Sequence, residues 1–349
     1  MASWFLGRGA GVCVTSAVFA CLVACGGSGS PVSTPTTPTA PATPAKPATP
    51  VTPTTTWSTS GQVVAAGTTQ GIAGATLTPG WGLTAVTTDA QGNYQLGDIA
   101  SPPSNPYPVT ISAPGASTHD VWVNWASGAR TGVTLDLIRD AAPFSMDFYR
   151  KFVRGTYDQR GAPWPVMRWT TQPSFYVKTT DQNGRPIEPE VMVRVLDAIR
   201  QAVPAFTAGH FSAATIETGT DSRPRVMGWI NVNIRRDPNE HRTCGQSLVG
   251  ANPGEITLND DVCSCGSNKI PGAVTMHEVG HAMGFFHVDD RRSLMYPFIS
   301  GDCPAGALSP AESYHVAIAY SRPRGNTDPD HDPTSGSAMT ASTAILVAR

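Results

Sequence analysis

The chain has 349 residues, of which 40% are hydrophobic and 14% charged, and it contains 34 glycines and 31 prolines. Its length suffices for two domains with cores of their own, and its glycine and proline content indicates that some of the chain is not packed core. The formal net charge of -2 excludes a strongly basic surface, so we expect no nucleic-acid partner.

The N-terminal residues 1–24 have the pattern of a signal peptide. Their one charge is Arg8, and an apolar run from Val12 to Ala24 is too short to span a bilayer. The run continues into Cys25 and Gly26, and Leu-Val-Ala-Cys-Gly resembles the lipobox of bacterial lipoproteins. This resemblance implies lipidation of Cys25 and an exported protein anchored in the bacterial cell envelope, at the outer membrane or cell surface. The alternative is a simple secretory signal with a stray cysteine.

Residues 25–56 are expected to form a lipid-anchored stalk, because nearly every residue from Pro31 to Thr56 is Pro, Thr, Ala, Val or Ser. Residues 57–139 change to short β-branched runs between turn signals, which predicts a small all-β sandwich. The turn from Asp89 to Tyr94, Asp-x-x-Gly-x-Tyr, resembles that of carboxypeptidase-regulatory-like sandwiches.

Residues 140–323 show a mixed α and β pattern. Apolar residues at helical spacing predict one helix over residues 191–206, and three strands are expected over residues 225–232, 246–249 and 255–258. Residues 324–349 have the composition of a flexible tail. The fold class is therefore a multidomain protein, with an α+β domain preceded by a small β-sandwich.

The strongest functional motif is the stretch His277-Glu278-Val279-Gly280-His281-Ala282-Met283-Gly284-Phe285-Phe286-His287. Residues four apart share one face of a helix, so His277 and His281 can bind one ion, and a turn at Gly284 would bring in His287. Three imidazoles suit one catalytic Zn²⁺ with an open position for water. Glu278 then serves as general base and proton shuttle. The alternatives are a structural zinc site and an inactive enzyme.

This stretch resembles the signature of the metzincin metallopeptidases, His-Glu-x-x-His-x-x-Gly-x-x-His followed by a Met-turn. Met295 in Leu-Met-Tyr-Pro is the candidate Met-turn residue and looks most like that of the matrixins. The resemblance implies a twisted mixed sheet beside the active-site helix, and we expect a monomer. Val288 departs from the matrixins, which usually have serine there, so the subfamily stays open. A structural Ca²⁺ also stays open, with no ligand set identified.

The metzincin resemblance also implies substrate contacts. Peptides bind extended along the edge strand upstream of the zinc helix, which places Ser247 and Leu248 at that edge. Val274 and Ile299 match positions that wall the pocket for the side chain after the scissile bond. Both are apolar, so we expect a preference for an apolar side chain there.

Four cysteines remain outside the leader and Cys25, and their even number in an exported protein favours disulfides. Two pairings stay open: 244–263 with 265–303, or 244–265 with 263–303. A second zinc site of four cysteines is the alternative. The four residues are Cys244, Cys263, Cys265 and Cys303.

The function we expect is a zinc-dependent endopeptidase that hydrolyses peptide bonds of proteins outside the cytoplasm. Its partners are a protein or peptide substrate and, through lipidated Cys25, a membrane. The alternative function is an envelope lipoprotein that binds glycan or protein through its sandwich and carries a vestigial metzincin domain.

Overall fold

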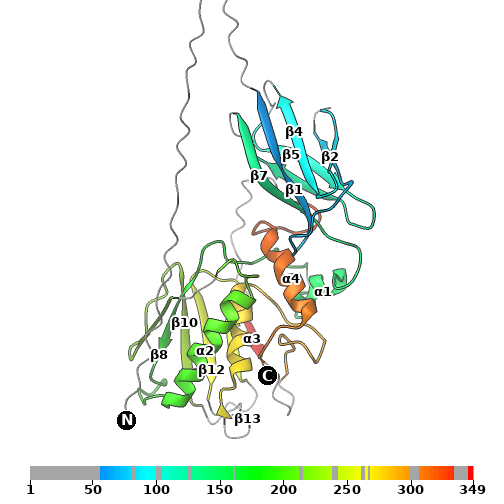
Figure 1. Cartoon of the computed structure of the whole chain (residues 1–349). Coiled ribbons are helices and arrows are strands. Elements are labelled where there is room, and N and C mark those ends of the chain that lie inside the picture. The colour runs from blue at the N-terminus through cyan, green and yellow to red at the C-terminus, as the bar shows by residue number, and fades with distance from the viewer. Residues whose placement is uncertain are drawn as a thin grey trace, which may run out of the picture. The chain divides into compact units, whose positions relative to one another are not determined.

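The computed structural model describes residues 56–80, 83–99, 104–124, 128–159, 162–211, 215–237, 243–260, 264–265, 268–298, 306–333 and 345–348. These residues form a mixed α and β structure with several sheets and few helices (Figure 1). Cys25 lies outside them, as do the predicted leader and nearly all of the stalk. No helix among the described residues is both long and apolar enough to cross a membrane.

The first part of the described chain consists of two sheets with a shared core. One sheet has the order β4-β1-β7 and the other the order β3-β2-β5-β6. Buried and less buried residues alternate along β5 and β6, as expected for strands with one face on a core. The strands are β1 (Trp57–Ala65), β2 (Thr76–Pro79), β3 (Val86–Thr87), β4 (Asn93–Ile99), β5 (Tyr107–Ser112), β6 (His119–Val123) and β7 (Ala129–Leu137).

The predicted turn between β3 and β4 is stabilised by one carboxylate. Asp89 Oδ1 accepts hydrogen bonds from the backbone N–H groups of Gln91 and Asn93, and Gly92 adopts a φ of 83°. Glycine tolerates this φ at no steric cost. The resemblance to carboxypeptidase-regulatory-like domains stays a prediction.

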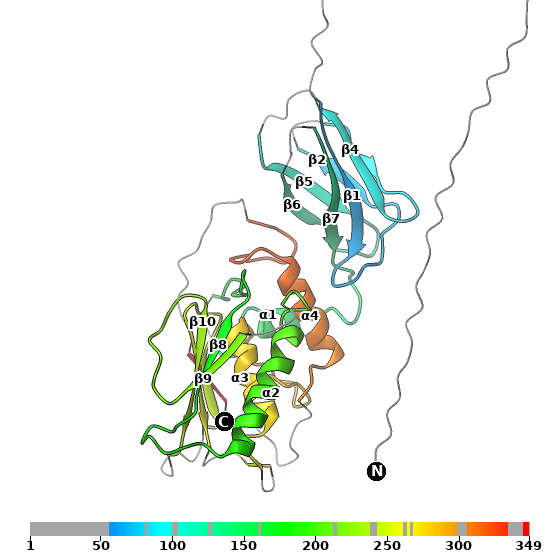
Figure 2. The ribbon, with the colours of Figure 1, turned by 60° about the vertical axis from the view of Figure 1, so that its left-hand side comes forward.

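The second part is built on a sheet with the order β15-β11-β12-β10-β8-β9. Strands β12, β10, β8 and β9 pair in parallel, and β11 pairs antiparallel with β12. Helices α2 and α3 lie together on one face of this sheet (Figure 2). The elements are α1 (Met146–Phe152), β8 (Ser174–Lys178), α2 (Pro189–Ala205), β9 (Thr215–Gly219), β10 (Trp229–Arg235), β11 (Gly245–Leu248), β12 (Gly254–Asn259), β13 (Ser264–Cys265), β14 (Asn268–Lys269), α3 (Gly272–Met283), α4 (Pro310–Ser321) and β15 (Ile345–Ala348).

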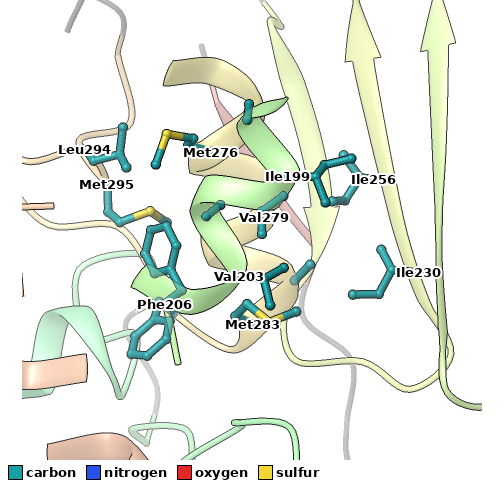
Figure 3. Packing of buried hydrophobic residues seen from close by; sticks show 14 of the residues in the cluster. Ile199, Val203, Phe206, Ile230, Ile256, Met276, Val279, Met283, Leu294 and Met295 are labelled. Carbon is teal, nitrogen blue, oxygen red and sulfur yellow. The ribbon is translucent and has the colours of Figure 1, made fainter. Parts of the chain in front are cut away.

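A hydrophobic core fills the space between this sheet and its two helices. Ile230 of β10 and Ile256 of β12 are fully buried in the same cluster as Ile199 of α2 and Val279 of α3 (Figure 3). The apolar stripe that predicts a helix over residues 191–206 is therefore the face that α2 packs on α3 and the sheet.

The last residues differ from the flexible tail expected from residue 324. The Arg324 guanidinium donates to the carbonyls of Met167 and Arg168, and Asn326 is fully buried. Residues 345–348 form β15 and pair with β11. Composition alone misses these contacts because their partners lie far away in the sequence.

Candidate metal centre and active site

Helix α3 carries the metal-binding motif inside the protein rather than on its surface. Every residue from Ala273 to Met283 is buried, including His277, Glu278 and His281. A helix without an exposed face has to pack on all sides. The contacts of α3 come from α2, β11, β12 and β15, so four elements fix the direction of its histidines.

Gly284 ends α3 and turns the chain. Its φ is 111° and its N–H bonds to the carbonyls of Gly280 and His281. A Cβ at Gly284 would lie 2.8 Å from the carbonyl carbon of Met167, so only glycine fits this turn. The turn brings His287 back toward the two helix histidines.

The three histidines converge on one point. Their Nε2 atoms are separated by 3.0 Å between His277 and His281, 3.1 Å between His281 and His287, and 3.2 Å between His277 and His287. Zinc–nitrogen bonds of about 2.0–2.1 Å in tetrahedral geometry need separations of about 3.3 Å. Within the described residues, these three form the one group of His, Cys, Asp or Glu that could hold a metal ion.

The other ring nitrogen of each histidine fixes its tautomer. Each Nδ1 contacts an oxygen that can only accept, so Nδ1 carries the proton and the Nε2 lone pairs face one another. Three facing lone pairs repel unless a cation lies between them, so the donor set fits zinc. The bonds run from His277 to the Leu294 carbonyl at 2.7 Å, from His281 to the Phe285 carbonyl at 2.7 Å, and from His287 to Asp158 Oδ1 at 2.6 Å.

Burial keeps the imidazoles of His277 and His281 neutral. It lowers the pKa of His277 to about 3, helped by the neighbouring His287, and it lowers the pKa of His281 well below its usual value, helped by His287 and His277. Neutral imidazole is the form that binds a metal. The site is therefore ready to take a cation at neutral pH without first losing protons.

Glu278 lies next to the cluster with an unsatisfied carboxylate. It is fully buried, and neither of its oxygens has a hydrogen-bond partner among the described residues. Burial raises its pKa well above the usual value. An unpaired buried carboxylate is costly, and a cationic metal centre with water would compensate that cost.

Two glycines let neighbouring segments approach α3 closely. A Cβ on Gly280 would lie 2.7 Å from Met295 Sδ and 2.6 Å from Phe206 Cζ, so the Met-turn and α2 meet at this glycine (Figure 3). A Cβ on Gly245 would lie 2.4 Å from Glu278 Oε1. The backbone of β11 therefore runs directly against the reactive carboxylate.

Two residues outside the predicted motif support the site. Asp158 follows α1 and contacts His287 twice, through Nδ1 and through the backbone N–H at 3.0 Å. Glu312 of α4 is fully buried and accepts hydrogen bonds from Ser293 Oγ at 2.6 Å and from the Met295 N–H at 3.3 Å. No local pattern marks Asp158, whereas Ser-Pro-Ala-Glu at residues 309–312 is a readable capping box that locates α4.

The predicted substrate residues belong to two elements that contact each other. Ser247 and Leu248 are on β11, which pairs with both β12 and β15, whereas Val274 is on α3 and is buried in the main core. Ile299 lies outside the described residues. The pocket for an apolar side chain stays a prediction.

One predicted disulfide cysteine can be followed in the described chain. Cys244 is buried and disulfide-bonded. Cys263 and Cys303 lie outside the described residues, as does the side chain of Cys265. Both pairings of the four cysteines stay predictions.

Comparison with known proteins adds a family match over the site. The matrixin family model, Peptidase_M10, matches residues 256–316, which run from β12 through α3, His287 and Met295 into α4. No curated protein matches the chain. The matrixin match and the three-histidine cluster together fit a metzincin-like zinc site and support a metallopeptidase.

Two solved structures show a weak likeness to this chain. The C-terminal interface mutant of a type II cohesin–X-dockerin complex from Acetivibrio cellulolyticus is 20% identical, with a TM-score of 0.19 over 23% of this chain and 56% of that chain. The N-terminal interface mutant is 22% identical, with a TM-score of 0.19 over 24% and 57%. The chain thus spans just over half the length of these solved chains, and a likeness of this size does not define its fold.

Proposed function

We propose that the protein is a zinc-dependent endopeptidase that hydrolyses peptide bonds of proteins outside the cytoplasm. The observation that carries this proposal is the convergence of three imidazole Nε2 atoms within 3.2 Å of one another, beside a buried carboxylate that has no hydrogen-bond partner among the described residues. A closed structural zinc site would have no use for Glu278. The matrixin match supports the same chemistry.

The residues of the site have two roles, binding of the metal ion and proton transfer. His277, His281 and His287 would hold the ion, which when bound supplies Lewis-acid polarisation of the attacking water and the peptide carbonyl. Glu278 takes a proton from that water on a carboxylate oxygen and delivers it to the nitrogen of the leaving amine. In the metal-free chain burial raises the pKa of Glu278, and a cation bound beside it would favour the ionised form that accepts a proton.

The test is Glu278→Gln, which keeps the shape of the side chain and removes its basicity. Since Glu278 is not a ligand, the variant should bind about one equivalent of zinc and lose about 10²–10⁴ in kcat/KM on peptides. Glu255→Gln is the matched control, because the Glu255 side chain is 37% exposed on β12 and should leave activity unchanged.

Metal content and peptide hydrolysis are measured on the same preparations. A Glu278→Gln variant that cleaves as fast as the original chain would rule out the assigned base. A zinc-loaded original chain without activity on a broad peptide library would favour the vestigial domain instead.

We also propose that Cys25 anchors the protein in the bacterial cell envelope. The lipobox-like sequence that ends at Cys25 supports this location, as does the proline-rich segment that follows it. A stalk of this composition would carry the peptidase away from the membrane surface toward large substrates.

A further inference from the structure

The C-terminal strand β15 covers a sheet edge that would otherwise be free. It pairs antiparallel with β11, with Ala348 opposite Gly245 and Ile345 opposite Leu248. The other neighbour of β11 is β12, so β11 would end the sheet without β15. The strand sequence, Ile-Leu-Val-Ala, is wholly apolar.

This edge lies beside the reactive residues. Gly245 is pressed against the Glu278 carboxylate, and Ala348 is its partner on β15. β15 also contacts α3 directly, and Figure 1 shows it in red beside the yellow helix. The last described residues of the chain therefore lie at the register position next to the base.

The side chains of the site are closed off in this arrangement. His277 is 5% exposed and His287 3%, while His281 and Glu278 are fully buried. A peptidase must admit a polypeptide to its base and its metal ligands. The groups that a substrate would have to reach are therefore covered in this state of the chain.

We propose that residues 345–348 are an intramolecular competitor for the substrate edge, which holds the full-length chain in an autoinhibited state. An extended peptide adds to a sheet edge through backbone hydrogen bonds, and β11 has one edge that β12 does not occupy, the edge that β15 now covers. β15 and a substrate cannot both pair with that edge. The proposal rests on the proposed peptidase function, and displacement of β15 activates the enzyme.

Tethering makes β15 an effective competitor although it is short. A segment on the same chain acts at an effective concentration on the order of millimolar, whereas a separate protein substrate binds only according to its concentration in solution. The unpaired backbone N–H and C=O groups of an uncovered edge strand are also a template for aggregation, so β15 protects the β11 edge while no substrate is bound. A strand with only this capping role would stabilise the sheet without inhibiting the enzyme.

The test disrupts β15 in the full-length, zinc-loaded chain. In an antiparallel pair only alternate residues donate their backbone N–H to the partner strand, so either residue 346 or residue 347 donates to β11. Proline has no backbone N–H, and the double variant Leu346→Pro with Val347→Pro therefore removes that donor in either case. Ser335→Pro with Ser337→Pro is the matched control, since it adds two prolines to the same end of the chain outside β15.

Two measurements decide the outcome. Hydrogen exchange of the amides of residues 245–248 should become faster in the β15 variant and stay unchanged in the control. If β15 is docked nine-tenths of the time, its release should raise kcat/KM on peptides about tenfold. Unchanged exchange would show that β15 does not dock, and faster exchange with equal or lower kcat/KM would leave only the capping role.

A third measurement separates this proposal from the proposed function. A peptide hydroxamate needs the metal and the substrate edge but no turnover, so its affinity should also rise about tenfold in the β15 variant. If the β15 variant binds the hydroxamate more tightly but no variant hydrolyses peptides, the peptidase function is wrong and the competition by β15 is supported. If all variants bind the hydroxamate equally well, the competition by β15 is wrong.

Discussion

The substitution Asp158→Asn tests how the protein sets its affinity for zinc. Asp158 is acceptor-only, and its two oxygens receive the Nδ1–H of His287 at 2.6 Å and the backbone N–H of His287 at 3.0 Å. Asparagine has one oxygen, so it can satisfy only one of these donors while its NH₂ group faces the other. It also removes the negative charge that makes the imidazole a stronger ligand.

The expected loss is about 10–100-fold in zinc affinity, as is typical when the support of a metal ligand is removed. This corresponds to about 1.4–2.8 kcal/mol in the free energy of binding. Competition titration against a chromophoric chelator at fixed pH measures it. Thermal melting of the metal-free proteins shows whether the fold is intact.

Asp289→Asn is the matched control. Asp289 lies two residues after His287, but its carboxylate is 57% exposed and pairs with Lys151 at 2.9 Å. Its loss should leave zinc affinity within about twofold, because an exposed pair contributes at most about 1 kcal/mol and does not touch the site. If Asp158→Asn binds zinc as tightly as the original chain, or if both variants lose affinity equally, Asp158 does not support the ligand in the way described.

Two further predictions concern stability and location. Arg236→Met removes a partner of the buried carboxylates Asp260 and Asp181. It should lower the free energy of unfolding by about 3 kcal/mol. This is near the lower end for a broken buried pair, because Lys269 remains 3.6 Å from Asp260. Urea unfolding measures this, and a midpoint equal to that of the original chain would contradict it. Cys25→Ser should move the protein from the membrane fraction to the soluble fraction, because it removes the site of lipidation, and immunoblotting of both fractions would expose an unchanged distribution.

The metal cluster was accessible from the sequence because its determinants are local. Helical spacing alone places His277 and His281 on one face of α3. Glycine is the residue type that permits the turn toward His287, and it stands at position 284. Met295 follows in the same short stretch and contacts the helix at Gly280. A motif that contains its own turn needs no knowledge of the remaining fold.

The supports of the cluster were not accessible in the same way. Asp158 is 129 residues before His287, and the tail strand is about 100 residues after the β11 residues with which it pairs. Ile-Leu-Val-Ala at the end of a polar stretch has strand propensity but no periodicity that names a partner. Pairing over such separations depends on the tertiary fold.

The hydrogen bonds made by the three histidine Nδ1 atoms show how local and distant supports differ. His281 bonds to Phe285, just beyond the end of its own helix, and His277 bonds to Leu294 in the Met-turn, so two ligands are held by backbone carbonyls inside the motif. Backbone carbonyls are insensitive to the identity of the residue that supplies them. Among the described residues, only His287 depends on a distant side chain, that of Asp158. The position after the Gly284 turn is therefore where a change far from the motif can weaken the metal site without altering any ligand.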